Sequence, residues 1–167
     1  MSKDFWYELA GQPEAVEQIR RAVEHRADGV FHSWLITGPP GSGRSVLAQK
    51  FAAALQCPEQ GCGKCHSCVL AAANTHPDIN VLSTEKVQIA IAEVRDLVNQ
   101  SSFGSSMGGY RILIIEDADR MAPVAANVLL KALEEPPANT IWILCAPSEV
   151  DMLPTIRSRV RKLRSEE

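Results

Sequence analysis

The amino-acid sequence predicts an α/β domain built around a largely parallel β-sheet. Short apolar runs alternate with segments of helical periodicity along the 167 residues, which is the pattern of this fold class. The run Ile112–Ile115 is unbroken, as expected of a central strand that is covered on both faces. Segment 38–45 is a glycine-rich turn between a predicted strand and a predicted helix, a context in which phosphate loops occur.

The composition limits the classes of function. Apolar residues make up 46% of the chain and charged residues 22%, which fits a globular domain and excludes a disordered chain. The formal net charge of -3 argues against a protein that coats nucleic acid, although it leaves room for a local basic patch. No apolar run approaches the roughly 18 residues of a membrane span, and residues 1–6 do not resemble a signal peptide. We therefore expect a cytoplasmic protein with reduced cysteines and no membrane contact.

Two helices and one strand are expected before the cysteine-rich segment. Apolar residues at helical spacing predict a helix over 13–26. Pro13 suits its first position because the missing N–H has no helical partner there. A buried strand follows over 32–37, then the Gly/Pro turn and a helix over 45–55.

The middle of the chain is expected to alternate between helix and strand. A short alanine-rich helix ends near Asn74, and a strand follows over 78–82. The next helix is amphipathic. Segment 101–109 is rich in serine and glycine, has little to bury and is expected to be flexible. The apolar stripe of the amphipathic helix comprises Val87, Ile91, Val94 and Val98.

The last part of the chain supplies the remaining strands. Residues 111–116 form the clearest strand, and a helix over 121–134 is ended by the following Pro136-Pro137. A second buried strand is expected over 141–145. A short helix over 152–156 and a strand over 159–163 complete the predicted elements.

Segment 38–45 fits the phosphate-loop pattern G-x-x-x-x-G-K-[ST] at every position but one. Arg44 stands where lysine is expected. Backbone N–H groups and the positive end of the next helix would hold a phosphate, and Ser45 would offer its hydroxyl to Mg²⁺. Because arginine is longer and planar, hydrolysis is expected to suffer. The alternative is a turn that binds nothing. The candidate nucleotide-binding residues are Gly38, Pro39, Pro40, Gly41, Ser42, Gly43, Arg44 and Ser45.

Two acidic residues follow the predicted central strand. Glu116 and Asp117 lie at its carboxyl end, where side chains meet the phosphate loop in such folds. One carboxylate could hold Mg²⁺ through water, and the other could orient the attacking water. Their order is the reverse of the usual Asp-Glu. Acidic residues that only begin the next helix are the alternative, with Asp119 as its cap.

Four cysteines predict a structural zinc site. Their spacing is C-x4-C-x2-C-x2-C, and four thiolates can surround one tetrahedral ion. An iron–sulfur cluster is the main alternative, and a disulfide pairing the other. A fifth cysteine, Cys145, lies in a predicted buried strand and is expected to be a core thiol. The candidate metal ligands are Cys57, Cys62, Cys65 and Cys68.

The segment 157–164 is strongly basic, with five cations in eight residues. If the segment were extended, Arg157, Arg159 and Arg161 would lie on one side. A solvated face is one reading. The functional readings are an arginine offered to a neighbouring nucleotide and a contact with a nucleic-acid backbone.

These motifs together resemble the AAA+ clamp-loader family. The resemblance covers nearly the whole chain and implies a three-layer AAA+ P-loop core, with the cysteines in a zinc module inserted at about 57–74. In this family the Ser-Arg-Cys motif, here Ser158-Arg159-Val160, supplies an arginine finger in trans, which implies that role for Arg159. Besides the phosphate loop and the cysteines, the matching segments are 9–12, 75–78, 127–137 and 157–160.

The resemblance also implies which activity is missing. Motor subunits of the family place a polar sensor after the strand predicted at 141–145, and this chain has Ala146-Pro147 there. With Arg44 and the inverted acidic pair, this implies a subunit that binds ATP or ADP with Mg²⁺ weakly, if at all. It would assist hydrolysis by a neighbour.

The implied function is loading of the sliding clamp on primed DNA during replication. The implied partners are the motor and delta subunits of a hetero-oligomer, together with the clamp and the DNA. The resemblance implies that the family's lid and collar domains are absent from residues 1–167. Two other functions remain open: an autonomous P-loop ATPase, and a zinc-dependent DNA-binding module with an inactive nucleotide fold.

Overall fold

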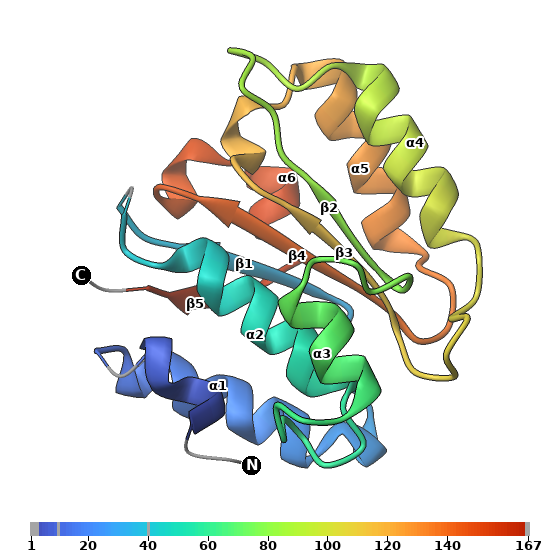
Figure 1. Ribbon diagram of the computed structural model, residues 1–167. Coiled ribbons are helices and arrows are strands. Elements are labelled where there is room, and N and C mark those ends of the chain that lie inside the picture. The colour runs from blue at the N-terminus through green and yellow to red at the C-terminus, as the bar shows by residue number, and fades with distance from the viewer. Residues whose placement is uncertain (1–3, 10, 40, 166–167) are drawn as a thin grey trace.

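A parallel five-stranded β-sheet forms the centre of the fold (Figure 1). In this computed structural model the described residues are 4–9, 11–39 and 41–165. The strand order is β2-β3-β4-β1-β5, and every neighbouring pair is parallel. The predicted α/β class and parallel sheet are therefore confirmed. The strands are β1 Ser33–Thr37, β2 Ile79–Leu82, β3 Arg111–Ile115, β4 Thr140–Ala146 and β5 Arg161–Arg164.

Helices cover both faces of the sheet and produce three layers (Figure 1). On one face lie α1 Pro13–Glu24, α2 Arg44–Gln56 and α3 His66–Ala72. On the other face lie α4 Ile91–Ser101, α5 Pro123–Glu134 and α6 Pro154–Arg157. Short 3₁₀ turns connect them: η1 Asp4–Leu9, η2 Arg26–Asp28, η3 Ala118–Arg120 and η4 Glu149–Asp151.

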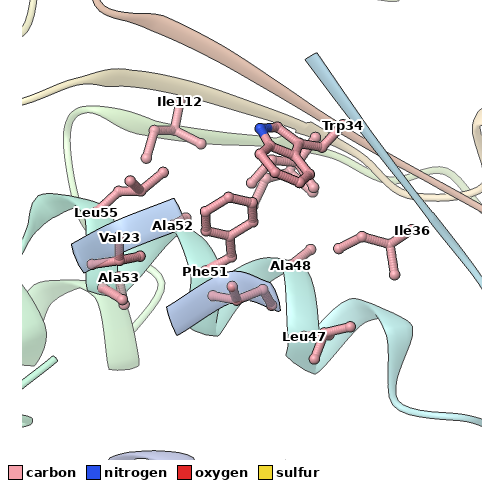
Figure 2. Close-up of a cluster of buried hydrophobic side chains, with 14 of the residues drawn as sticks. Val23, Trp34, Ile36, Leu47, Ala48, Phe51, Ala52, Ala53, Leu55 and Ile112 are labelled. Atoms are coloured by element: carbon pink, nitrogen blue, oxygen red, sulfur yellow. The ribbon is translucent and has the colours of Figure 1, made fainter. Parts of the chain in front are cut away.

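The alternation of side chains along each strand divides the interior into two cores. On β1, Trp34 and Ile36 pack towards α1 and α2, whereas Leu35 packs towards α4 and α5. Figure 2 shows Trp34 beside Phe51 of α2, with ring centroids 5.1 Å apart and planes at 83°. Edge-to-face contacts of this kind are favourable. The sheet is therefore held from both sides, which fixes the ends of its strands.

The amphipathic helix begins later than its apolar stripe predicts. Val87 was expected in the helix but precedes it and is 89% exposed. The chain is extended at Ile89, whose N–H donates to the Arg120 carbonyl at 2.8 Å. The helix can start only after this bridge, where the Glu93 carboxylate accepts the Ala90 N–H at 2.8 Å. A tertiary contact thus overrides the local pattern.

The serine- and glycine-rich loop before β3 is tied to a buried carboxylate. Asp78 has no exposed surface and accepts hydrogen bonds from the hydroxyls of Ser105 and Ser106 and from the N–H groups of Ser106 and Met107. Arg111 lies 3.5 Å from the same carboxylate. Segment 101–109 was expected to be flexible, but these hydrogen bonds to Asp78 hold it in place. The local sequence does not reveal them.

The other differences lie at element ends. The helix expected over 121–134 begins at Pro123, and the strand expected over 159–163 begins at Arg161. The helix expected over 152–156 begins at Pro154 as α6, and the separate turn η4 ends before it at Asp151. Within the described residues, no helix combines the length and the apolar character needed to cross a bilayer.

Candidate phosphate-binding, metal and arginine sites

The phosphate loop joins the end of β1 to the start of α2. Gly43 has a φ of +86° and precedes α2, which has no side-chain cap at its N-terminus. The first N–H groups of α2 are therefore available to an anion. Gly38 is required for space, because a Cβ there would lie 2.5 Å from Ser42 Oγ and 2.6 Å from the Ser165 carbonyl oxygen. The described loop residues are Gly38, Pro39, Gly41, Ser42, Gly43, Arg44 and Ser45, and Pro40 lies outside the described residues.

Arg44 is already engaged by the chain itself. Its Nη1 donates to the Gly38 carbonyl at 2.7 Å, and its Nη2 lies 3.1 Å from Asp117 Oδ1. The two side chains are only 13% and 27% exposed. A phosphate entering the loop would therefore compete with a carboxylate for the guanidinium. This arrangement can hold the loop without an anion.

The acidic pair meets the loop, as its position after the central strand predicts. Ser45 Oγ donates to Glu116 Oε1 at 2.6 Å. The serine hydroxyl and the first carboxylate thus contact each other directly, while Asp117 is paired with Arg44. Asp119 does not cap the next helix, because η3 contains it and Ala122 is the residue before α5.

The phosphate loop and the acidic pair border a hollow of about 390 Å³. Cys145 lies at its wall, and burial raises the pKa of this thiol to about 12, with the nearby Glu116 carboxylate acting in the same direction. The predicted core thiol is thus confirmed as a buried group. The hollow is lined by Gly41, Gly43, Arg44, Ser45, Glu116, Asp117 and Cys145.

Ala146 and Pro147, at the position where a polar sensor was expected, contact the phosphate loop through their backbone carbonyls. The Gly38 N–H lies 3.3 Å from the Ala146 carbonyl oxygen and 3.2 Å from that of Pro147. These carbonyls hold the start of the phosphate loop against the end of β4. Neither residue has a side chain that could orient a water molecule.

Two residues that carry no motif also hold the loop. Gln12 Nε2 donates to the Ser42 carbonyl at 2.6 Å. Ser165 Oγ lies 2.7 Å from Gln12 Oε1 and 2.9 Å from the same Ser42 oxygen. This contact was not predicted because Gln12, Ser42 and Ser165 are far apart in the chain. The one signal for Gln12 was that segment 9–12 matches the resembled family. Ala10 of that segment lies outside the described residues.

The four predicted cysteines converge. Their sulfur atoms all lie within 4.8 Å of one another, and Cys57 Sγ is 3.6 Å from Cys62 Sγ and 3.7 Å from Cys65 Sγ. Tetrahedral zinc with Zn–S bonds of about 2.3 Å requires sulfur separations of about 3.8 Å. All five cysteines are free thiols in this structure, so the disulfide alternative is not supported. The donor set and spacing fit one tetrahedral metal ion.

The backbone around the cysteines favours thiolate at one of them. Burial opposes charge on Cys57, but N–H donors from Cys62, Gly61 and Glu59 lower its pKa to about 6. Burial raises the pKa of Cys65 and Cys68. Turns of this kind direct N–H groups at sulfur: Cys65 N–H lies 3.2 Å from Cys62 Sγ. The site can therefore stabilise the negative charge that a bound metal leaves on sulfur.

Arg159 lies between α6 and β5 and is not part of a strand. Its Nη2 lies 2.9 Å from Glu134 Oε1, and the two side chains are 40% and 43% exposed. Its carbonyl accepts the Ser33 hydroxyl at 2.6 Å. The expected alternation of three arginines on one extended face is wrong, because Arg157 ends α6 and only Arg161 belongs to β5.

Comparison with known proteins decides the family. The family model described as DNA polymerase III, delta subunit, matches residues 11–167. The chain belongs to this family. A curated relative from Pseudomonas aeruginosa, DNA polymerase III subunit delta', is 41% identical over 134 residues, which is 77% of this chain and 41% of the relative. The Escherichia coli subunit delta' is 35% identical over 145 residues, covering 83% of this chain and 43% of the relative.

Proteins named as a second polymerase III subunit are also similar. The Mycobacterium bovis subunit gamma/tau is 31% identical over 157 residues, covering 91% of this chain and 27% of that relative. The chain spans less than half the length of these relatives.

Solved structures support the fold. A gamma-subunit-related protein from Thermotoga maritima has a TM-score of 0.68 at 24% identity, covering 90% of this chain and 45% of that one. The RuvB branch migration motor of the same organism has a TM-score of 0.58 at 18% identity, covering 96% and 46%. Both likenesses concern the fold alone, and they support the expected three-layer core around a parallel sheet.

Proposed function

We propose that this chain is the AAA+ domain of a delta-prime-type clamp-loader subunit that supplies Arg159 to the ATP site of a neighbouring motor subunit. The whole protein would help to place a sliding clamp on primed DNA during replication. Family membership and the delta' relatives support the assembly. The position of Arg159 supports its role within that assembly.

The observation that carries the proposal is the separation of Arg159 from its own phosphate loop. The Arg159 backbone is bonded to Ser33, the first residue of β1, and the phosphate loop follows Thr37, the last. Four strand steps of about 3.3 Å place these ends about 13 Å apart. Arg159 thus lies at the start of β1, whereas the phosphate loop of the same chain follows the end of that strand. Its partly exposed guanidinium is available to another subunit.

The chain's own nucleotide site fits a supporting role. Arg44 replaces the lysine of the phosphate loop and is paired with Asp117. The sensor position offers Ala146 and Pro147, which engage the loop through backbone. Weak binding of ATP or ADP with Mg²⁺ is compatible with Ser45 and Glu116, whereas efficient hydrolysis lacks the groups that would orient water.

The cysteine module is proposed to bind one structural zinc ion. Four thiolates leave no open coordination position, so the ion would stabilise the module and not take part in a reaction. The ligands would be Cys57, Cys62, Cys65 and Cys68, brought together by the turn before α3 and by α3 itself.

The proposed setting is a cytoplasmic hetero-oligomer. Its other members would be the motor subunits and the delta subunit, with the sliding clamp and primed DNA as the objects of the reaction. Residues 1–167 would form the phosphate-loop domain, with the zinc module inserted at about 57–74. The lid and collar domains would belong to parts of the protein outside this sequence.

The test is Arg159→Ala in the full-length subunit, assembled with its motor subunits, clamp and primed DNA. An arginine finger contributes about 10³–10⁵ in rate at the site it serves. We expect one site's share of the single-turnover ATP burst to disappear. Arg157→Ala, a matched change two residues earlier, is the control and should leave the burst intact. A normal burst with Arg159→Ala would refute the arginine role, and turnover by this chain alone would favour an autonomous ATPase.

A further inference from the structure

A second hollow lies between α1 and the edge strand β5, away from the phosphate loop. Its volume is about 520 Å³, within the range of ligand sites. Arg161, which borders it, is paired in register with Trp34 near the start of β1, whereas the phosphate loop follows the other end of that strand. The hollow is therefore separate from the candidate nucleotide site. Its lining comprises Gln18, Arg21, Ala22, His25, Gly29, Val30, Phe31, Trp34, Arg161 and Lys162.

The lining is basic although the chain is acidic overall. Among the described residues, three cationic side chains and one histidine border the hollow, and no carboxylate does, in a chain of net charge -3. Lys162 contributes least, because its ammonium lies 3.4 Å from Glu149. In the part of the chain that the structure describes, the Arg21 side chain is paired along its own helix alone, with Glu17 at 3.3 Å. Such exposed pairs are weak and can be exchanged for a phosphate.

Arg161 is the central cation of the hollow. Its guanidinium lies over the Phe31 ring at 5.0 Å from the centroid and near the Trp34 ring at 5.9 Å. Among the described residues it has no carboxylate partner. A guanidinium supported by aromatic rings keeps its positive charge and presents a flat surface.

Trp34 is held in place before any ligand arrives. Its Nε1 donates to the Phe31 backbone carbonyl at 2.8 Å, which fixes the indole ring beside the Phe31 backbone. Trp34 is also packed edge-to-face on Phe51 (Figure 2). Binding would therefore spend little free energy on ordering these groups.

We propose that this hollow binds single-stranded nucleic acid. One base would stack on the Arg161 guanidinium, and the phosphates on either side would contact Arg21 and His25. Flat cations and aromatic rings are the groups that hold unpaired bases, and basic side chains follow the backbone. The site is independent of the phosphate loop and of Arg159, so it extends the proposed function and does not depend on it.

Fluorescence anisotropy with a labelled oligothymidylate of about 12 nucleotides, in about 50 mM salt, tests this site on the protein. Arg161→Ala should weaken binding about tenfold, because it removes the stacking surface. Arg161→Lys keeps the charge and should also weaken binding. Arg164→Ala removes the same charge from the same strand outside the hollow, and should change affinity less than about twofold. Circular dichroism confirms that each variant is folded.

Two further probes identify the ligand. An abasic strand of equal length has the same phosphates, and should bind about tenfold more weakly than the thymidylate. An oligoglutamate of similar charge should fail to displace the thymidylate. Equal binding of the abasic strand, equal loss with Arg161→Ala and Arg164→Ala, or displacement by oligoglutamate would each overturn the proposal.

Discussion

Arg44 and Asp117 form an ion pair across the mouth of the phosphate loop, with Nη2 and Oδ1 3.1 Å apart. The residues come from the start of α2 and from the turn after β3, so the pair closes the gap between two elements. Asp117 adopts a left-handed conformation, with a φ of +55°. The position expected to serve catalysis thus neutralises the cation that would hold a phosphate.

Asp117→Asn is therefore expected to tighten binding of ADP. The change removes the carboxylate that competes for Arg44, and a partly exposed pair of this kind corresponds to about fivefold in affinity. Calorimetric titration with ADP, and with ATP plus Mg²⁺, measures it. Asp119→Asn is the matched control, and Arg44→Ala should weaken binding. Weaker binding with Asp117→Asn would mean that the carboxylate serves nucleotide.

The cysteine module should contain about one equivalent of zinc. Cys62→Ser should lose the ion and lower thermal stability, because metal binding and folding of such a module are coupled. Cys145→Ser removes the thiol outside the cluster and should retain the metal. Elemental analysis distinguishes the cases. Iron in the purified protein, or well under half an equivalent of zinc, would contradict the assignment.

Asp78 should make stability depend on pH below about 4. Burial opposes its charge, but hydrogen bonds from Ser105, Ser106 and Met107 lower its pKa to about 2 from the ordinary 3.8. The folded state thus binds the proton less readily than the unfolded state. The carboxylate contributes about 2 kcal/mol above pH 4, and this contribution is lost as the pH falls towards 2.

Urea unfolding of the wild type and of Asp78→Asn across that range measures the effect. The variant should be less stable at pH 7, and the difference between the two proteins should shrink as the pH falls. Asp96→Asn, an exposed change on α4, should leave the profile unchanged. A constant difference at every pH would show that the Asp78 charge does not anchor the loop.

The Arg159–Glu134 pair should contribute little to stability. Both side chains are about two-fifths exposed, and such pairs are worth about 0–1 kcal/mol. Glu134→Gln should therefore lower the free energy of unfolding by less than about 1 kcal/mol. Leu133→Ala, at the buried neighbouring position, should cost about 2–5 kcal/mol. If Glu134→Gln cost as much, Arg159 would be locked in place and unsuited to reach a neighbour.

Local patterns predicted the elements whose cause is local. Apolar composition alone was enough to predict the buried strands β3 and β4. Residue spacing alone was enough to predict the cysteine cluster and the phosphate loop. Val87 and the loop tied to Asp78 were misjudged because a bridge at Ile89 and a buried carboxylate decide them through distant contacts. Gln12 escaped notice for the same reason.

The connection between Gln12, Ser42 and Ser165 has a mechanical consequence. The Ser165 hydroxyl turns about a single side-chain bond, and it lies within hydrogen-bonding distance of Gln12 and the Ser42 carbonyl. It cannot follow a displaced backbone without giving up one of these contacts. A displacement of the phosphate loop would therefore break hydrogen bonds at Ser165, directly after β5, and a displacement of Ser165 would break hydrogen bonds to the loop.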